Sequence, residues 1–144
     1  MELTYNGKKS KKEILEILPI SYFSKPISEK ENILINGENL EVLRILVHNS
    51  NLKNKIDLIY IDPPFATNGI FTISEERAST ISSSKKDEIA YTDNLLGEEF
   101  LEFLRARLIL VRELLSDRGS IYLHIDYKIG HYVKIIMDEI FGTI

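Results

Sequence analysis

The tetrapeptide Asp62-Pro63-Pro64-Phe65 combines a carboxylate, two rigid prolines and an aromatic ring. A conjugated amino group, such as that of adenine or cytosine, is a poor nucleophile because its lone pair is delocalised into the ring. A carboxylate and a fixed backbone carbonyl that accept its two hydrogens draw the nitrogen toward tetrahedral geometry and make that lone pair available. These residue types, in this order, are suited to activating an amino group for attack.

Each residue of the motif has its own part in this chemistry. The charge of Asp62 also stabilises the cation that develops on the nitrogen. The carbonyl of Pro63 is the second acceptor, held in place because neither Pro63 nor Pro64 can change its φ angle. Phe65 offers a flat apolar face on which an extruded base can stack. The alternative is a stiff turn, which Asp-Pro-Pro also forms without any catalytic role.

An almost wholly apolar run over residues 56–61 leads directly into the motif. Such a run predicts a strand that is buried on both faces, as in a parallel sheet. Binding sites of open α/β sheets lie at the carboxyl ends of their strands, which is where the motif stands. This position favours the catalytic interpretation over the plain turn.

Strand-like and helical patterns alternate along the rest of the chain. Short strands are expected at 33–35 and 121–125, and apolar spacing predicts helices over 40–48, from 100 to about 119, and over 129–140 with Gly142 as C-cap. Residues 66–97 show no sustained periodicity and are expected to form a long loop, functional or disordered. This order predicts an α/β fold with an open, mostly parallel sheet flanked by helices.

Residues 1–30 are expected to form an N-terminal arm with one short helix. Ser10 and Glu13 make a capping box ahead of an apolar run, and Pro19 ends the helix. Four lysines of the arm either contact phosphate or lie on a solvated surface, and the solvated surface is the preferred interpretation. These lysines are Lys8, Lys9, Lys11 and Lys12.

The composition narrows the protein class. A length of 144 residues with 44% apolar side chains fits one globular domain. The absence of cysteine excludes a disulfide scaffold and a cysteine zinc site, and fits a reducing cytoplasm. No apolar run approaches the roughly 20 residues of a membrane span. The net charge of −4 does not indicate a nucleic-acid binder, and the three scattered histidines predict no metal site.

The motif and its flanking segments resemble the S-adenosylmethionine-dependent DNA amino-methyltransferases, in particular the adenine-specific enzymes of Type III restriction–modification systems. The similar segments cover roughly residues 31–142; they are NILINGENLEVLRIL, KIDLIYIDPPF, RARLILVRELLSDRGSIYLHID and KIIMDEIFG. The resemblance implies a Rossmann-like methyltransferase fold, with residues 31–144 as the N-terminal part of a catalytic domain. It implies methyl transfer from S-adenosylmethionine to adenine N6 of a base flipped out of double-stranded DNA.

Two alternatives to this function stay open. Cytosine N4 is chemically close to adenine N6, and the motif alone does not separate the two. A truncated product with only a scaffold or dimerisation role is the non-enzymatic alternative. The resemblance also implies a restriction subunit and a second copy of the chain as partners.

Carried over residue by residue, the resemblance makes Asp62, Pro63, Pro64 and Phe65 the catalytic and base-binding positions. It places Gly37 and Glu38 near the adenosine of the cofactor, although the family usually has Asp where this chain has Glu38. A plain strand-to-helix turn explains Gly37 and Glu38 equally well.

Two further positions, Asp126 and Arg107, are candidates for a role in the site. Asp126 lies at the carboxyl end of the expected strand 121–125, near a cofactor or base, with helix capping as the alternative. Arg107 matches a recurring Arg-Leu and is expected either to face DNA or a partner, or to be an exposed helical arginine.

No Gly-x-Gly occurs in the chain, whereas the resemblance implies a glycine-rich cofactor loop. In the permuted branch that this chain resembles, that loop and the target-recognition region come later, beyond residue 144. The chain is therefore expected to be the N-terminal part of a longer enzyme, inactive alone and binding the cofactor weakly or not at all. Without the strand that carries the loop, residues 33–35 lack a neighbour and strand 56–61 has an exposed apolar edge, so association is expected.

Overall fold

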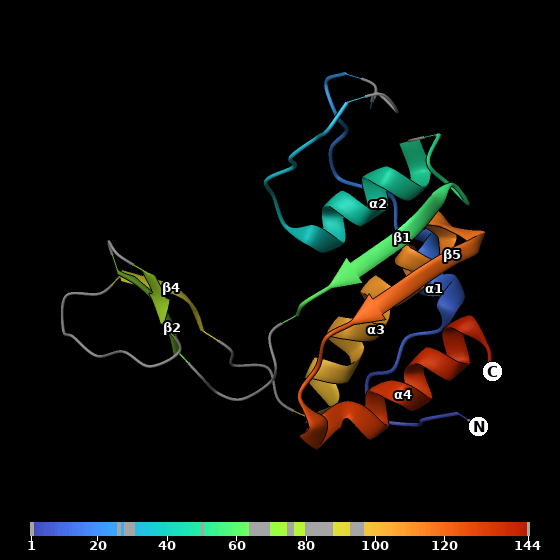
Figure 1. The fold of residues 1–144 in the computed structure, drawn as a ribbon. Coiled ribbons are helices and arrows are strands. Elements are labelled where there is room, and N and C mark those ends of the chain that lie inside the picture. Colours follow the sequence, from blue (N-terminus) through green and yellow to red (C-terminus); the bar gives the residue numbers. More distant parts are fainter. Residues whose placement is uncertain are drawn as a thin grey trace.

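The computed structural model describes residues 2–25, 27, 31–49, 51–63, 70–74, 77–79, 88–92 and 97–143. Its helices are α1 (Lys11–Glu16), α2 (Asn39–Asn49), α3 (Gly97–Leu114) and α4 (Tyr127–Phe141). Its strands are β1 (Ile56–Ile61), β2 (Ile70–Ser74), β3 (Arg77–Ser79), β4 (Glu88–Thr92) and β5 (Leu115–Leu123). The predicted α/β class is confirmed, with a smaller parallel sheet than the resemblance implies (Figure 1).

Strands β1 and β5, which correspond to the runs expected at 56–61 and 121–125, form a parallel pair. The parallel arrangement agrees with the expected sheet, and the structure adds which strands are neighbours. Tyr60 lies beside Tyr122 and Ile61 beside Leu123, so the carboxyl ends of both strands meet at the same edge of the sheet. The chain between these strands includes α3, which packs with α1, α2 and α4. Helix α3 is therefore the centre of the main body (Figure 1).

The helix expected to reach about residue 119 ends earlier, at Leu114, and β5 begins at once with Leu115. The backbone N–H groups of Asn54 and Lys55 donate to the carbonyls of Glu113 and Leu114, which stops the helix by capturing its last acceptors. Gly119 belongs instead to an irregular part of β5, since the register shifts between Ile56 and Leu58.

Residues 33–35 form no strand, so that prediction is wrong. A strand needs a neighbour for its backbone groups, and among the described residues none pairs with this segment. Its side chains stay largely in solvent, Leu34 with 96% of its surface exposed.

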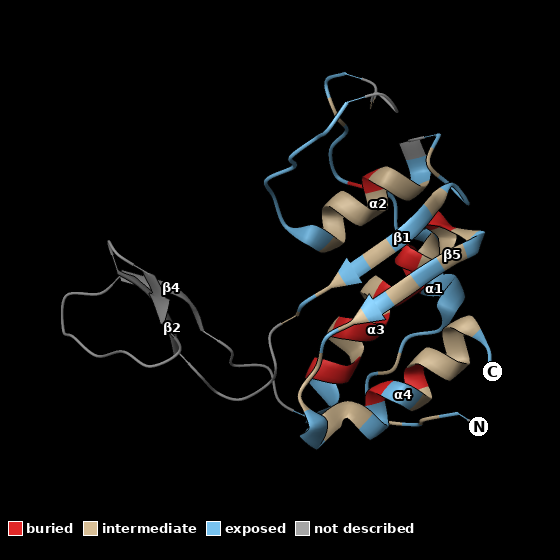
Figure 2. Ribbon diagram, in the orientation of Figure 1, coloured by how far each residue is buried: buried red, intermediate tan, exposed pale blue. Residues whose placement is uncertain are grey.

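Strand β1 is not buried on both faces, which corrects the expectation from its apolar run. The face of β1 and β5 that includes Leu58, Tyr60 and Tyr122 is open, with exposures of 62%, 67% and 60%. The other face includes Ile61, Ile121 and Leu123, which pack onto the core. In Figure 2, β1 and β5 are coloured mostly as exposed or intermediate, pale blue and tan, whereas much of α3 is coloured red, as buried.

The stretch 66–97, expected to be a loop, contains a three-stranded antiparallel sheet in the order β3-β2-β4. Thr72 pairs with Ser79, and Phe71 pairs with Tyr91. Strands β2 and β4 contain β-branched and aromatic residues, which favour strands even where no longer periodicity is present. The rest of that stretch lies outside the described residues.

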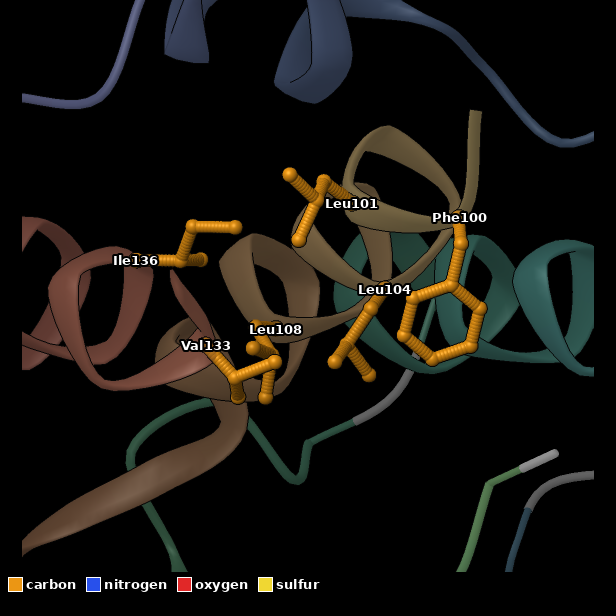
Figure 3. Close-up of a cluster of buried hydrophobic side chains, with 6 residues drawn as sticks. All are labelled: Phe100, Leu101, Leu104, Leu108, Val133 and Ile136. Carbon is orange, nitrogen blue, oxygen red and sulfur yellow. The ribbon is translucent and has the colours of Figure 1, made fainter. Parts of the chain in front are cut away.

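The core lies mainly between α3 and α4. Figure 3 shows the side chains of this cluster, with Leu108 of α3 beside Val133 of α4; its members are Phe100, Leu101, Leu104 and Leu108 of α3 and Val133 and Ile136 of α4. Their spacing along each helix follows the 3.6-residue period that the sequence displays. A second cluster joins Ile14 of α1 to Ile109 and Leu110 of α3.

The N-terminal arm contains the predicted helix, and the capping box of Ser10 and Glu13 is confirmed. The preferred interpretation of the four lysines is confirmed for Lys9, Lys11 and Lys12, which are exposed, whereas Lys8 is only 11% exposed. The Tyr5 hydroxyl donates to Glu102 at 2.6 Å, and Lys8 forms an ion pair with Glu139 at 2.9 Å. Lys11 and Lys12 also have acidic partners, Glu113 and Glu16. In the part of the chain that the structure describes, no helix is long and apolar enough to cross a membrane.

Candidate active site at the carboxyl ends of β1 and β5

Asp62 directly follows β1, at the edge where both parallel strands end. It continues the alternation of Leu58 and Tyr60, so its side chain belongs to the open face of the sheet. The side chain is 58% exposed. A carboxylate in this position is accessible to a ligand that approaches the strand ends.

His124 lies beside Asp62 at the end of the neighbouring strand. Its backbone N–H donates to the Ile61 carbonyl at 2.9 Å, which extends the ladder between the strands by one step. Its ring Nδ1 lies 3.0 Å from the Asp62 Oδ1. The two side chains therefore form a polar pair at the carboxyl ends of β1 and β5.

The remaining residues of the motif are described only in part. Pro63 follows Asp62 directly and is half-buried. Pro64 and Phe65 lie outside the described residues. Their roles in holding the carbonyl and stacking a base stay predictions.

Asp126 is the N-cap of α4, and its carboxylate accepts from the Lys128 N–H at 2.8 Å. The capping alternative is thus confirmed. The carbonyl of Asp126 also accepts from the N–H groups of Ile129 and Gly130. A direct role for this side chain toward a cofactor or base stays a prediction.

Gly37 and Glu38 lead into α2, in agreement with the turn interpretation. The Glu38 carboxylate accepts from the Glu41 N–H at 2.9 Å through Oε2. Its Oε1 forms an ion pair with Arg107 at 2.7 Å. Both oxygens are therefore engaged within the protein, and the predicted contact with a cofactor has no support from this geometry.

Arg107 is not an exposed helical arginine, which corrects that interpretation, whereas the expectation that it faces DNA or a partner stays a prediction. Its side chain is only 13% exposed. The guanidinium donates to Asn39 and to the Phe103 carbonyl, and it lies 3.5 Å from the centroid of the Phe103 ring. It connects α3 to the start of α2.

The contact between Asp62 and His124 was missed by reasoning from the sequence. The sequence does show that Asp62 and His124 each directly follow an apolar, strand-like run. That observation predicts a contact only when the register of β1 and β5 is known, because a slip of one residue moves a side chain to the other face of the sheet. Within the described ranges, no three histidine or acidic side chains form a group that could hold a metal ion.

Comparison with known proteins agrees with this arrangement. The DNA methylase family matches residues 56–144, which include β1, the residues after it, β5 and α4. The chain is 37% identical to the Type II methyltransferase M.EcaI of Enterobacter cloacae, over 97% of this chain and 29% of that protein. It is 34% identical to the StyLTI Mod subunit of a Type III restriction-modification enzyme of Salmonella typhimurium, over 77% of this chain and 18% of that protein.

A third relative, the Type II methyltransferase M.KpnI of Klebsiella pneumoniae, is 33% identical over 81% of this chain and 25% of its own length. The chain thus spans less than a third of the length of each of these relatives. The family match covers more than half of the chain and contains the pair of strands that carries Asp62 and His124. The chain belongs to the DNA methylase family.

Proposed function

We propose that this chain contains the residues that activate the target amino group in a DNA methyltransferase. The enzyme methylates adenine N6 in a restriction–modification system. The observation that carries the proposal is the position of Asp62-Pro63 at the carboxyl end of a strand in a parallel pair, inside the family match. The substrate is double-stranded DNA with the target base flipped out of the helix. Adenine is preferred because the relatives include Mod subunits of Type III enzymes, which the flanking segments resemble.

In the proposed reaction, Asp62 accepts one hydrogen of the target amino group and the Pro63 carbonyl accepts the other. The two acceptors localise the nitrogen lone pair, and the negative charge of Asp62 stabilises the positive charge that develops during transfer. Phe65 stacks on the extruded base and holds its amino group in the plane of the two acceptors. The exposure of the Asp62 side chain, 58%, supports this role because it leaves the carboxylate accessible.

The DNA methyltransferases of this family generally use S-adenosylmethionine as the methyl donor. The acidic residues that the resemblance assigns to that cofactor already accept hydrogen bonds within the protein, although a carboxylate has further lone pairs. Glu38 is bound to Arg107 and to the Glu41 N–H, and Asp126 is bound to the Lys128 N–H. A role of Glu38 or Asp126 toward the cofactor stays a prediction, and the present proposal concerns the activation of the target base.

The test is a methylation assay with the protein expressed from its own gene at its natural length. DNA is incubated with the protein and isotopically labelled S-adenosylmethionine, and the nucleosides released by digestion are analysed by mass spectrometry. We expect N6-methyladenine as the product. N4-methylcytosine in its place overturns the adenine assignment, and no methylated base overturns the proposed function.

Asp62→Ala tests the role of the carboxylate, with a loss of at least about 100-fold in kcat expected. Asp57→Ala is the matched control, because Asp57 stands at the opposite end of the same strand. Its carboxylate accepts from the Ser116 hydroxyl at 2.7 Å, away from the carboxyl edge. We expect this control to stay within about threefold of the unsubstituted protein. Equal effects of the two substitutions contradict the role given to Asp62.

A further inference from the structure

We propose that His124 is a positioning residue for Asp62, donating a hydrogen bond from Nδ1 that fixes the orientation of the carboxylate. This proposal rests on the proposed function and adds a residue to it. The distance of 3.0 Å between Nδ1 and Oδ1 is that of a hydrogen bond. No part of the Asp-Pro-Pro-Phe motif predicts this partner.

An isolated aspartate in this position would not be held in one orientation. Asp62 is 58% exposed and follows the last residue of β1, so rotation about its side-chain bonds is opposed by few neighbours. Activation of an amino group requires that one carboxylate oxygen lie in the plane of the base, beside the Pro63 carbonyl. A misplacement of about 1 Å is enough to cost on the order of 100-fold in rate.

The proposed hydrogen bond leaves Asp62 able to act. An ionised carboxylate has about four lone-pair positions on two oxygens. The His124 contact uses Oδ1, and Oδ2 stays available for the target amino group. Neutral imidazole donates one hydrogen without neutralising the carboxylate, so the negative charge that stabilises the transition state is retained.

His124 is itself held by the sheet. Its backbone N–H is bound to the Ile61 carbonyl, so the residue is attached to the strand that precedes Asp62. Two residues later, Asp126 starts α4 as its N-cap. The donor and the acceptor are thus carried by adjacent parallel strand ends, and their separation is set by the spacing between strands.

The contact becomes more important when a base enters. Both side chains are exposed before binding, where water competes for their hydrogen bonds. A base stacked at the strand ends excludes that water, and the electrostatic interaction between the pair strengthens in the drier environment. The contact is therefore expected to affect the rate of transfer more than the affinity for DNA.

The kinetic test compares His124→Leu with His124→Asn in the protein at its natural length. Leucine removes the donor, whereas the asparagine amide nitrogen, like Nδ1, is attached to Cγ and can donate to Asp62. We expect His124→Leu to lower kcat about 10- to 100-fold, with KM for DNA within about threefold. His124→Asn is expected to restore kcat to within about fivefold of the unsubstituted protein.

These outcomes separate the present proposal from the function on which it rests. No methyl transfer by the unsubstituted protein overturns both. Normal transfer combined with an unchanged kcat in His124→Leu overturns only the role of His124. The same holds if His124→Asn loses as much activity as His124→Leu, because a purely steric role would then explain the result.

A spectroscopic measurement tests the contact without any dependence on activity. Nitrogen-15 NMR of labelled histidine distinguishes the two neutral tautomers, and we expect His124 to carry its proton on Nδ1. Asp62→Ala is expected to reduce that preference, whereas Asp57→Ala leaves it unchanged. A tautomer with the proton on Nε2, insensitive to Asp62→Ala, rules out the proposed donation.

Discussion

Arg107 of α3 and Glu38, the residue before α2, form an ion pair in which Nη2 lies 2.7 Å from Oε1. The same guanidinium donates from Nε to Asn39 at 2.6 Å. Glu38 in turn accepts from the Glu41 N–H in the first turn of α2. The pair therefore attaches the start of one helix to the middle of another, and it gives Glu38 a structural role.

Glu38→Gln is expected to destabilise the protein at neutral pH but not in acid. Partial burial raises the pKa of Glu38, but hydrogen bonds from the Glu41 and Leu40 N–H groups and the Arg107 charge outweigh it, so the pKa is lowered. A lowered pKa gives stability that is present above the unfolded-state pKa and is lost as the pH falls through the folded-state value. Because Glu38 is exposed, we expect less than about 1 kcal/mol.

Urea unfolding of Glu38→Gln and the unsubstituted protein at pH 7 and at pH 3 measures this difference. The free energies of unfolding should differ at pH 7 and converge at pH 3. A difference that is as large at pH 3 as at pH 7 would show that the carboxylate charge is not the cause.

Gly119→Ala is expected to destabilise the protein by about 1–3 kcal/mol, because an added methyl group has no room. A Cβ at this position would lie 2.8 Å from the Ile56 carbonyl oxygen and 2.6 Å from a Leu115 side-chain carbon. The carbonyl belongs to the backbone of β1 and cannot rotate away, so the strands would have to separate.

Gly130→Ala is the matched control, since a Cβ there meets nothing within 4 Å. Gly130 lies in α4, where alanine favours the helix by up to about 1 kcal/mol. Thermal unfolding should therefore show a lower Tm for Gly119→Ala and an equal or higher Tm for Gly130→Ala. Equal shifts in the two variants would refute the close approach at Gly119.

Glu139→Gln is expected to destabilise the protein by about 1–3 kcal/mol, because it leaves the half-buried Lys8 with only the exposed Glu2 as an acidic partner. The Lys8 and Glu139 side chains are 11% and 13% exposed, and Glu139 also accepts from the Leu3 N–H. Chemical unfolding monitored by circular dichroism measures the loss.

The control for this substitution is Glu16→Gln. Glu16 pairs with Lys12 on the exposed surface of α1, at 3.7 Å and with side chains that are 65% and 81% exposed. We expect a change below about 0.5 kcal/mol. A similar loss from both glutamates would mean that burial of the Lys8 pair contributes nothing.

The open face of the sheet is expected to cause concentration-dependent association of residues 1–144. Leu58, Tyr60 and Tyr122 are exposed on this face, and the edge of β1 opposite β5 has no strand partner among the described residues. Exposed apolar strands of this kind pair with other chains. Sedimentation velocity should show larger species at higher concentration, and Leu58→Lys should reduce them. Monomers at all concentrations would disprove this prediction.

Helix periodicity was readable from the sequence because each helix packs one face onto a common core. The apolar spacing around Leu104 and Leu108, and that around Val133 and Ile136, predicted α3 and α4, and these faces meet in the structure. The capping box at Ser10 and the C-cap at Gly142 were also correct, since both depend on residues close in the chain. The order of elements predicted a mostly parallel sheet, but the pairing of β1 with β5 came from the structure.

The errors arose where a segment depends on a distant neighbour. Ile33 to Ile35 have the composition of a strand, but no strand beside them takes their hydrogen bonds within the described part of the chain. The face of Leu58 and Tyr60 is apolar but open, because no element in that part covers it. Helix α3 ends at Leu114 through backbone bonds from residues 54 and 55, which no local pattern reveals.

The sequence by itself determined the motif, its place after a strand, the α/β order and the family, because these depend on residue types and short-range spacing. Only the tertiary structure decided which side chains meet. It paired His124 with Asp62 and Arg107 with Glu38, across 62 and 69 residues of sequence. Strand register and helix packing set these contacts, and both are determined by the burial of the whole core rather than by any local segment.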